Sequence, residues 1–246
     1  MCELNGYAKG KKCILVIGAT GGIGEKTAEY LVSKGYFVVL VGRSTEKLSA
    51  LNKALEPNSI YYEYDFKDLY NIESIFEYIS DLGIKLDGLV HAAGINRDIA
   101  IRSNDVDTMQ EVTAVNYMSF VEIMKYYMKK KYSNEEGSVV AVSSYATKDI
   151  APAMCTYTAS KAALEAAVAV AAKEGLKRKL RVNAILPSCV DTNMISNSGF
   201  LDRETADSRQ PFGIIPTIHI AYLIEFLLSE KSNYITGAMI PITAGV

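Results

Sequence analysis

The sequence is short of the residues that anchor a chain in a membrane or tie it together through metals and disulfides. No apolar run reaches the ~18 residues of a membrane span, and residues 1–12 lack the apolar core of a signal peptide. The four cysteines (Cys2, Cys13, Cys155 and Cys189) are widely scattered without a CxxC pair, and there are two histidines. We therefore expect a cytoplasmic protein with reduced thiols, no structural zinc site and no membrane contact.

An excess of one charge, linkers and repeats are missing as well. The formal net charge is −2, so nothing in the composition suggests a nucleic-acid partner. No Pro- or Ser-rich linker divides the 246 residues, and 49% of them are apolar, which is enough for a sizeable core. We interpret residues 1–246 as one domain.

What the sequence does contain is a regular alternation of apolar runs and helical segments. The expected strands are 12–17, 36–41, 59–64, 86–90, 138–143, 180–186 and 234–243. The expected helices are 25–34, 44–56, 68–82, 108–131, 162–179 and 219–229. This alternation predicts an α/β fold, a single doubly wound parallel sheet flanked by helices on both faces.

The segment Ser144–Lys161 can bring a hydroxyl, a phenol and an ammonium together. Tyr157 and Lys161 are four residues apart, so they share one face of the helix expected there, and Ser144 lies where the preceding strand ends. The ammonium would lower the phenol pKa from ~10, and the phenol could then exchange a proton with an alcohol or ketone oxygen. A tyrosine and a lysine at this spacing are more often a solvated pair. The other motifs must therefore decide whether this pair takes part in catalysis.

A glycine-rich turn follows the first expected strand. It runs from Gly18 to Gly24 and includes Thr20, Gly22 and Ile23. Glycines let a backbone turn sharply and approach a pyrophosphate at the start of a helix. Turns use glycine freely, but a strand before this one and a helix after it favour dinucleotide binding.

These motifs, in this order, resemble those of the short-chain dehydrogenase/reductase family over residues 11–245. The resemblance implies a Rossmann-type fold and hydride transfer between a nicotinamide cofactor and a carbonyl or secondary alcohol. It implies four catalytic residues, Asn116, Ser144, Tyr157 and Lys161. Tyr157 would exchange the proton, Ser144 would orient the oxygen, Lys161 would bind the nicotinamide ribose, and Asn116 would distort its helix and keep a water.

The same resemblance implies which residues would contact the cofactor. They are Gly18, Thr20, Gly22, Ile23, Gly24, Arg43, Ser44, Asp65, Phe66, Ala92, Ala93, Gly94, Tyr157, Lys161, Pro187, Val190 and Thr192. Asp65 and the Phe66 backbone would meet the adenine, although an aspartate opening a turn before a helix is almost as good an interpretation. Thr192 would hold the carboxamide.

Three positions depart from the family pattern. Ile17 stands where the family usually has Thr before the first glycine, and Ser188 stands where it has Gly after Pro187. His91 replaces the first residue of the usual Asn-Asn-Ala-Gly. We expect His91 to be a structural hydrogen-bonding residue rather than a proton shuttle.

The end of the second expected strand bears on the choice of cofactor. An NAD-specific fold places an acid there for the ribose 2′-hydroxyl, whereas this chain has Gly42 followed by Arg43. A guanidinium can clamp a 2′-phosphate, so we predict NADP(H) over NAD(H). The alternative is an ordinary surface arginine at a strand end.

The substrate is less well defined than the reaction. The stretch His91–Asp98 resembles that of 3-oxoacyl-carrier-protein reductases, and Lys129–Lys131 with Lys177–Lys179 could dock an acidic carrier protein. Two solvated helix ends explain those charges equally well. Residues 193–216 carry no clear pattern and would form a substrate lid.

Several alternatives therefore stay open. The prediction is limited to a small-molecule carbonyl or alcohol, either free or carried on a carrier protein. Sugar, steroid and small-alcohol dehydrogenases have the same core motifs. A catalytically silent dinucleotide-binding sensor is the rival from another class, although such relatives usually lack the tyrosine or the lysine.

Small residues in the helix after the catalytic segment point to self-association. Seven alanines lie between Ala162 and Ala172, and one helix cannot bury them all on its own sheet. Since the family pairs this helix across two-fold axes, we predict a homodimer or homotetramer, with good helix propensity as the alternative explanation. Cys155 and Cys189 are interpreted as small apolar filler rather than catalytic groups.

Overall fold

Seven parallel strands form one sheet in a computed structural model that describes residues 8–196 and 203–246. The strands are β1 (Cys13–Ile17), β2 (Phe37–Gly42), β3 (Ser59–Glu63), β4 (Leu86–His91), β5 (Ser133–Val142), β6 (Arg181–Pro187) and β7 (Met239–Ile242). Their order across the sheet is β3-β2-β1-β4-β5-β6-β7. The predicted doubly wound parallel sheet is confirmed.

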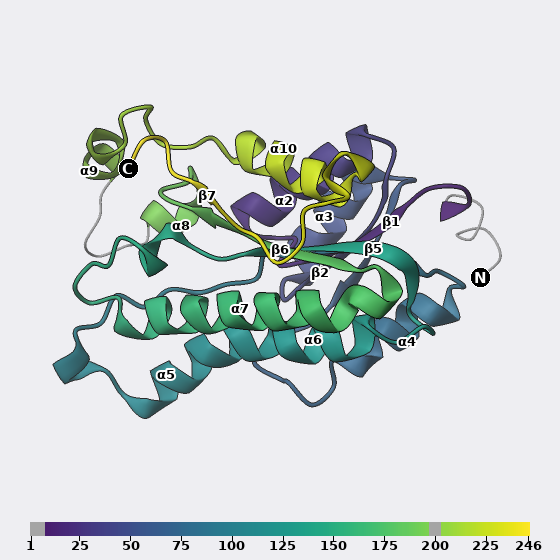
Figure 1. The fold of residues 1–246 in the computed structure, drawn as a ribbon, viewed down its shortest axis with the longest axis horizontal. Coiled ribbons are helices and arrows are strands. Elements are labelled where there is room, and N and C mark those ends of the chain that lie inside the picture. Colours follow the sequence, from purple (N-terminus) through teal and green to yellow (C-terminus); the bar gives the residue numbers. More distant parts are fainter. Residues whose placement is uncertain (1–7, 197–202) are drawn as a thin grey trace.

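Helices cover both faces of the sheet (Figure 1). On one face lie α2 (Gly22–Ser33), α3 (Thr45–Leu55) and α10 (Thr217–Leu228), and on the other lie α4 (Glu73–Asp81), α5 (Val106–Thr113), α6 (Ser119–Tyr127) and α7 (Cys155–Glu174). The short elements are α8 (Asn193–Ser196), α9 (Arg203–Arg209) and the single turns η1 (Ile101–Ser103), η3 (Tyr145–Thr147), η4 (Gly175–Arg178) and η5 (Glu230–Ser232).

The core consists of two apolar layers, one on each side of the sheet. Strands β1, β2 and β6 are buried along their whole length, as apolar strands covered on both faces must be. One layer packs Phe76, Phe120 and Leu164 from α4, α6 and α7 against the sheet. The other packs Leu31 and Ile224 from α2 and α10, together with residues of α3.

The chain reverses its direction of winding between β1 and β4. These strands are neighbours, with Ile17 beside His91, although two strands and three helices separate them in the sequence. The carboxyl ends of β1 and β4 therefore mark the switch point of the sheet, which is where ligands bind in folds of this kind.

The helix predicted over 68–82 begins later, at Glu73. The carboxylate of Asp68 accepts hydrogen bonds from the Tyr70 backbone nitrogen at 2.9 Å and from Asn71 Nδ2 at 2.7 Å. An aspartate that bonds its own backbone two residues ahead makes a turn that competes with the helix. The first five residues of the predicted helix are therefore a turn.

The long helix predicted over 108–131 is interrupted and shorter. A π-helical segment, η2 (Ala114–Met118), separates α5 from α6, and α6 ends at Tyr127. The guanidinium of Arg178 donates to the Met128 carbonyl at 2.7 Å and to that of Ser133 at 2.7 Å, and so binds the chain just after the helix end. Lys129–Lys131 lie beyond the helix rather than in its last turn.

The strands at 138–143 and 234–243 also differ in length from the prediction. Strand β5 begins five residues earlier, at Ser133, because Ser133 pairs with Leu86 across a register shift. Strand β7 is confined to Met239–Ile242. Just before it, the Asn183 side chain donates to the Ile235 carbonyl at 2.9 Å and accepts from the Ala238 nitrogen at 3.0 Å, so a side chain takes bonds that a backbone ladder would otherwise make.

The outer face of α7 carries an exposed stripe of small and apolar residues. Ala162 and Ala166 are exposed, and Val170 is 55% exposed. A homodimer or homotetramer would bury this stripe, and that assembly stays a prediction. Among the described residues, no helix is long and apolar enough to cross a membrane.

Candidate active site

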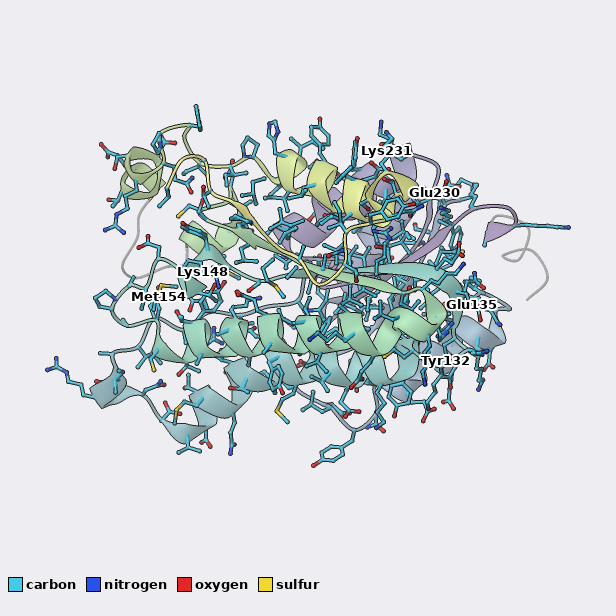
Figure 2. All side chains as sticks on the ribbon, in the orientation of Figure 1. Tyr132, Glu135, Lys148, Met154, Glu230 and Lys231 are labelled. Atoms are coloured by element: carbon cyan, nitrogen blue, oxygen red, sulfur yellow. The ribbon has the colours of Figure 1, made fainter. Side chains whose placement is uncertain are left out.

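The candidate residues gather at the carboxyl end of the sheet. Figure 2 shows Lys148 and Met154, which follow β5, at one end of the molecule, and Tyr132 and Glu135, at the start of β5, at the other. The glycine turn after β1, the loop after β4 and the Pro187–Thr192 segment after β6 also leave carboxyl ends of strands. Parallel strands thus bring distant sequence motifs to one edge.

The glycine turn lies directly against the loop after β4. Gly18 has φ +79°, and a Cβ added there would lie 2.6 Å from the Ala93 nitrogen. A Cβ on Gly24 would lie 2.2 Å from the Gly18 carbonyl oxygen. Neither position can hold a side chain without moving backbone. No side chain caps α2, which begins at Gly22, so the amino end of that helix can face an anion.

A cavity of about 230 Å³ runs from this turn toward β2 and β3. It is lined by Gly18, Thr20, Gly21, Gly42, Arg43, Ser44, Lys47, Tyr64, Asp65, Phe66, Lys67, Ala92, Ala93, Gly94, Ile95 and Val115. Backbone groups and small residues line one part of the cavity. The cationic side chains Arg43, Lys47 and Lys67 line another. This lining suits the phosphate-bearing adenosine half of a dinucleotide.

Lys47 and Lys67 are cavity residues that the motif comparison missed. Lys47 lies in the first turn of α3, and its backbone nitrogen donates to the capping Ser44 hydroxyl at 3.4 Å. Its position four residues after Arg43 was the available signal. Lys67 lies 2.8 Å from Glu111 in an ion pair, and nothing in the sequence indicated that contact.

Tyr157, Ser144 and Lys161 converge as predicted. Tyr157 and Lys161 lie on α7 and are 8% and 3% exposed, and Ser144 precedes η3 at the end of β5. The Ser144 side chain lies beside the Tyr157 phenol and acts to lower its pKa. Lys161 Nζ lies 5.9 Å from the Tyr157 ring centroid and donates to the Val142 carbonyl at 2.8 Å.

Asn116 joins the same cluster from the π-helical segment. Its Oδ1 accepts from the Ile95 nitrogen at 2.8 Å, and its Nδ2 donates to the Ile95 carbonyl at 2.9 Å and to Ser160 Oγ at 3.0 Å. A Cβ on Gly94 would lie 3.1 Å from Lys161 Nζ and 3.5 Å from Asn116 Oδ1. The helix is distorted at Asn116, as the resemblance implied, and the side chain holds the loop after β4.

Burial sets the proton affinities of the tyrosine and the lysine. It raises the pKa of Tyr157, against the opposing effect of the Ser144 hydrogen bond, and Asp98 raises that pKa further. In the protein alone the phenol pKa is therefore raised, whereas the sequence predicts a lowered one. Burial lowers the pKa of Lys161 to about 8, against the opposing charge of Glu165.

Comparison with known proteins shows which family has this sequence and fold. A family model described as enoyl-(acyl carrier protein) reductase matches residues 18–246. The 3-oxoacyl-[acyl-carrier-protein] reductase FabG of Thermotoga maritima is 33% identical over 97% of this chain and 98% of its own.

The chain belongs to the short-chain dehydrogenase/reductase family. The FabG of Rickettsia felis is 32% identical over 96% of both chains. Two solved structures at 25% identity also match: a variant of ElxO with NADPH bound (TM-score 0.85, 95% of this chain and 98% of that one) and the angucycline C-6 ketoreductase LanV with bound NADP (TM-score 0.88, 95% of each). Family membership makes the protein an oxidoreductase acting on CH–OH and C=O groups.

His91, which departs from the usual family asparagine, is a buried structural residue. Its Nε2 lies 2.9 Å from Ser119 Oγ, and that hydroxyl donates to the Val115 carbonyl at 2.7 Å, so the imidazole must be the donor to Ser119. Burial, with the charge of Lys161, lowers the pKa of His91 to about 3. A ring that stays neutral fits the structural interpretation, and its bond to Ser119 ties β4 to the start of α6.

Glu165 is a buried carboxylate near the site that the motif comparison also missed. It is 8% exposed, accepts from Ser143 Oγ at 2.8 Å and from Thr147 Oγ1 at 2.7 Å, and pairs with Lys148 Nζ at 3.0 Å. These contacts fasten the loop that carries Ser144 to the helix that carries the family tyrosine. A glutamate in an alanine-rich helix gave no such signal in the sequence.

The segment after β6 closes the site on its remaining side. Pro187 ends β6, Val190 is buried, and Val190 forms an isolated bridge with Ile215. Thr192 reaches the glycine turn, since a Cβ on Gly22 would lie 2.9 Å from its Cγ2. The predicted lid, 193–216, lies partly outside the described residues, and its role stays a prediction.

Proposed function

We propose that the protein is an NADP(H)-dependent carbonyl reductase with Tyr157 as its proton donor. One observation carries the proposal: a buried tyrosine lies beside Ser144 and one turn from the buried Lys161, whose ammonium lies against Gly94 in the lining of a cavity that also contains Arg43, Lys47 and Lys67. Acid–base and positioning groups thus stand beside a site suited to a phosphate-rich dinucleotide.

Cofactor binding divides between the two parts of the cavity. Gly18, Gly22 and Gly24 would let the pyrophosphate approach the backbone at the start of α2. Arg43 and Lys47 would bind the 2′-phosphate, because a guanidinium and an ammonium match a phosphate at hydrogen-bonding distance. When bound, NADPH supplies the hydride that the carbonyl carbon receives. Two neighbours of known structure hold NADPH or NADP, which supports this choice.

The proton chemistry rests on the side chains of the chain. Tyr157, kept neutral by its raised pKa, donates its proton to the carbonyl oxygen, and Ser144 holds that oxygen by a hydrogen bond. Lys161 is charged below about pH 8, and its ammonium stabilises the phenolate that Tyr157 becomes. Asn116 fixes the loop after β4 beside the lysine.

The pH dependence of the reaction follows from Tyr157 and Lys161. Glu165 and His91 are the charged and polar neighbours of Lys161. The lowered pKa of Lys161 means that it loses its proton as the pH rises through about 8. We expect kcat/KM for carbonyl reduction to be constant below about pH 8 and to fall above it, whereas alcohol oxidation should rise with pH. Steady-state rates in both directions test this, and a reductive profile that stays flat to about pH 10 contradicts it.

We propose a 3-oxoacyl thioester as the substrate class, because curated relatives across bacteria and in humans are named 3-oxoacyl-[acyl-carrier-protein] reductases. The test measures NADPH oxidation with acetoacetyl thioester on carrier protein, with acetoacetyl-coenzyme A, and with sugar, steroid and small ketones. We expect thioesters to exceed the other carbonyls by at least about a hundredfold in kcat/KM. Preference for a sugar or steroid would support the alternative dehydrogenases instead.

Docking of a carrier protein on the two lysine runs stays a hypothesis. Lys129 and Lys130 pair with Glu73 and Glu135, and Lys179 pairs with Glu136. Glu135 lies at the end of the molecule opposite Lys148 and Met154 (Figure 2). Within one protomer, the acyl arm of a carrier protein bound at these lysines would have to span the length of α7 to reach the candidate site. That length is about 30 Å at 1.5 Å per residue.

A further inference from the structure

Gln210 is a buried polar side chain in a mostly exposed segment. It follows α9 and is 3% exposed, whereas Asp207, Ser208 and Arg209 before it and Pro211 after it are exposed. An uncharged amide is buried without loss of stability only where its hydrogen-bonding groups find partners. The partners of Gln210 therefore show what it holds.

All four hydrogen-bonding positions of the Gln210 amide are used. Its Oε1 accepts from the Cys189 backbone nitrogen at 2.8 Å and from the Ser188 hydroxyl. Its Nε2 donates to the Cys189 carbonyl at 3.1 Å and to the Gly213 carbonyl at 2.9 Å. Turning the amide over would place donors against the Cys189 nitrogen, so this orientation is the one that the partners permit.

The amide thus pairs with both backbone groups of one loop residue, as a neighbouring strand would. Backbone bonds extend the pairing: the Ile215 nitrogen donates to the Cys189 carbonyl at 3.0 Å, and the Asp191 nitrogen donates to the Ile215 carbonyl at 2.9 Å. The chain just after Gln210 is also held by a backbone bond, because the Phe212 nitrogen donates to the Ala244 carbonyl at 3.1 Å. Figure 1 shows α9 and the carboxyl terminus at the same end of the fold.

Ser188 and Gln210 complement each other. Ser188 occupies the position where the family motif has glycine, and glycine has no hydroxyl to donate to the amide. The Ser188 hydroxyl also lies 3.0 Å from the Thr243 carbonyl. The departure noted in the sequence is therefore one half of a contact between the loop after β6 and the segment after α9.

We propose that Gln210 is a positioning residue that fixes the Ser188–Thr192 loop at the nicotinamide end of the cofactor site, with Ser188 as its partner. This rests on the proposed function, which places the nicotinamide beside Thr192. The adenosine end of the site, at Arg43 and Lys47, is formed by other elements and does not depend on Gln210. Loss of the amide should affect one end of the cofactor and not the other.

The experiment compares two ligands on the Gln210→Leu variant of the full chain: NADPH, and 2′,5′-ADP, which lacks the nicotinamide. Leucine removes the amide and leaves the Cys189 backbone nitrogen without its partner, while the Cys189 carbonyl keeps the Ile215 nitrogen. We expect the Kd of NADPH to rise about tenfold and kcat to fall, while the Kd of 2′,5′-ADP stays within about twofold of wild type. Gln110→Leu is the matched control, because Gln110 is exposed on α5, and it should change neither Kd.

The outcomes separate the two proposals. Unchanged NADPH binding and turnover in Gln210→Leu overturns the role of Gln210, and so does an equal loss of both ligands, which would make the contact merely structural. If Gln210→Leu does not fold, Ser188→Gly removes one of the four bonds, and the same two Kd values decide. If wild-type protein binds 2′,5′-ADP and NADPH but reduces no carbonyl, the proposed function fails while the ligand comparison still tests Gln210.

Discussion

Replacing Tyr157 with phenylalanine is expected to lower kcat for carbonyl reduction about a thousandfold and to leave the Kd of NADPH within about twofold. General acid catalysis contributes about a hundredfold to ten-thousandfold, and phenylalanine has no hydroxyl proton to donate. The ring itself stays, so the packing of a side chain that is 8% exposed is preserved. Steady-state NADPH oxidation gives kcat, and nicotinamide fluorescence gives the Kd.

A matched control separates the loss of the phenol from a general effect of the substitution. Tyr70 is 95% exposed, so Tyr70→Phe removes a hydroxyl of the same kind away from the site and should leave both quantities unchanged. Activity of Tyr157→Phe close to that of wild type would remove Tyr157 from the mechanism. An equally large loss of NADPH binding would show that the tyrosine serves the cofactor site rather than proton transfer.

Replacing Arg43 with aspartate is expected to raise the Kd of NADPH about a hundredfold and to change the Kd of NADH by about twofold or less. A charge-assisted bond to the 2′-phosphate would be lost, and a carboxylate would repel the same phosphate. Lys47 and Lys67 line the same cavity and would retain part of the affinity. Fluorescence titration with each nucleotide measures both constants.

Arg102→Asp is the control for the change in net charge. Arg102 is exposed in η1 and carries the same charge, so its replacement should alter neither Kd by more than about twofold at physiological ionic strength. If Arg43→Asp binds NADPH as tightly as wild type does, Arg43 is an ordinary surface arginine and the cofactor preference needs another explanation. An equal loss of NADH would indicate local unfolding at the end of β2.

The fold could be predicted because its signals are local and strong. Apolar runs such as Ile14–Ile17 and Phe37–Val41 are typical of strands buried on both faces, and the glycine turn after the first of them can be recognised by its spacing. The proximity of Tyr157 and Lys161 could be predicted because four-residue spacing fixes one relative to the other on α7.

The errors arose where a side chain competes with the backbone. Asp68 makes a turn in place of the first part of a helix, and Asn183 takes bonds that would otherwise extend β7. Neither contact follows from composition or periodicity. In each case a short polar side chain satisfies backbone groups that the regular element would have used.

Properties that depend on burial could not be predicted either. The sequence shows that Lys161 neighbours Tyr157 but not that burial of the tyrosine raises the phenol pKa. Glu165 and Gln210 reach the site from an alanine-rich helix and from a segment without pattern, and only the packed structure places them against the loops they hold.

Hydride transfer from NADPH to the substrate can be followed with an isotope label. Wild-type protein is incubated with NADPH carrying deuterium at both C4 positions and with acetoacetyl thioester, and the product is analysed by mass spectrometry. We expect a 3-hydroxy product with one deuterium on its carbinol carbon for each NADPH oxidised. Binding of NADPH without its oxidation, on this thioester and on every ketone of the panel, would contradict it and favour a dinucleotide-binding protein without catalysis.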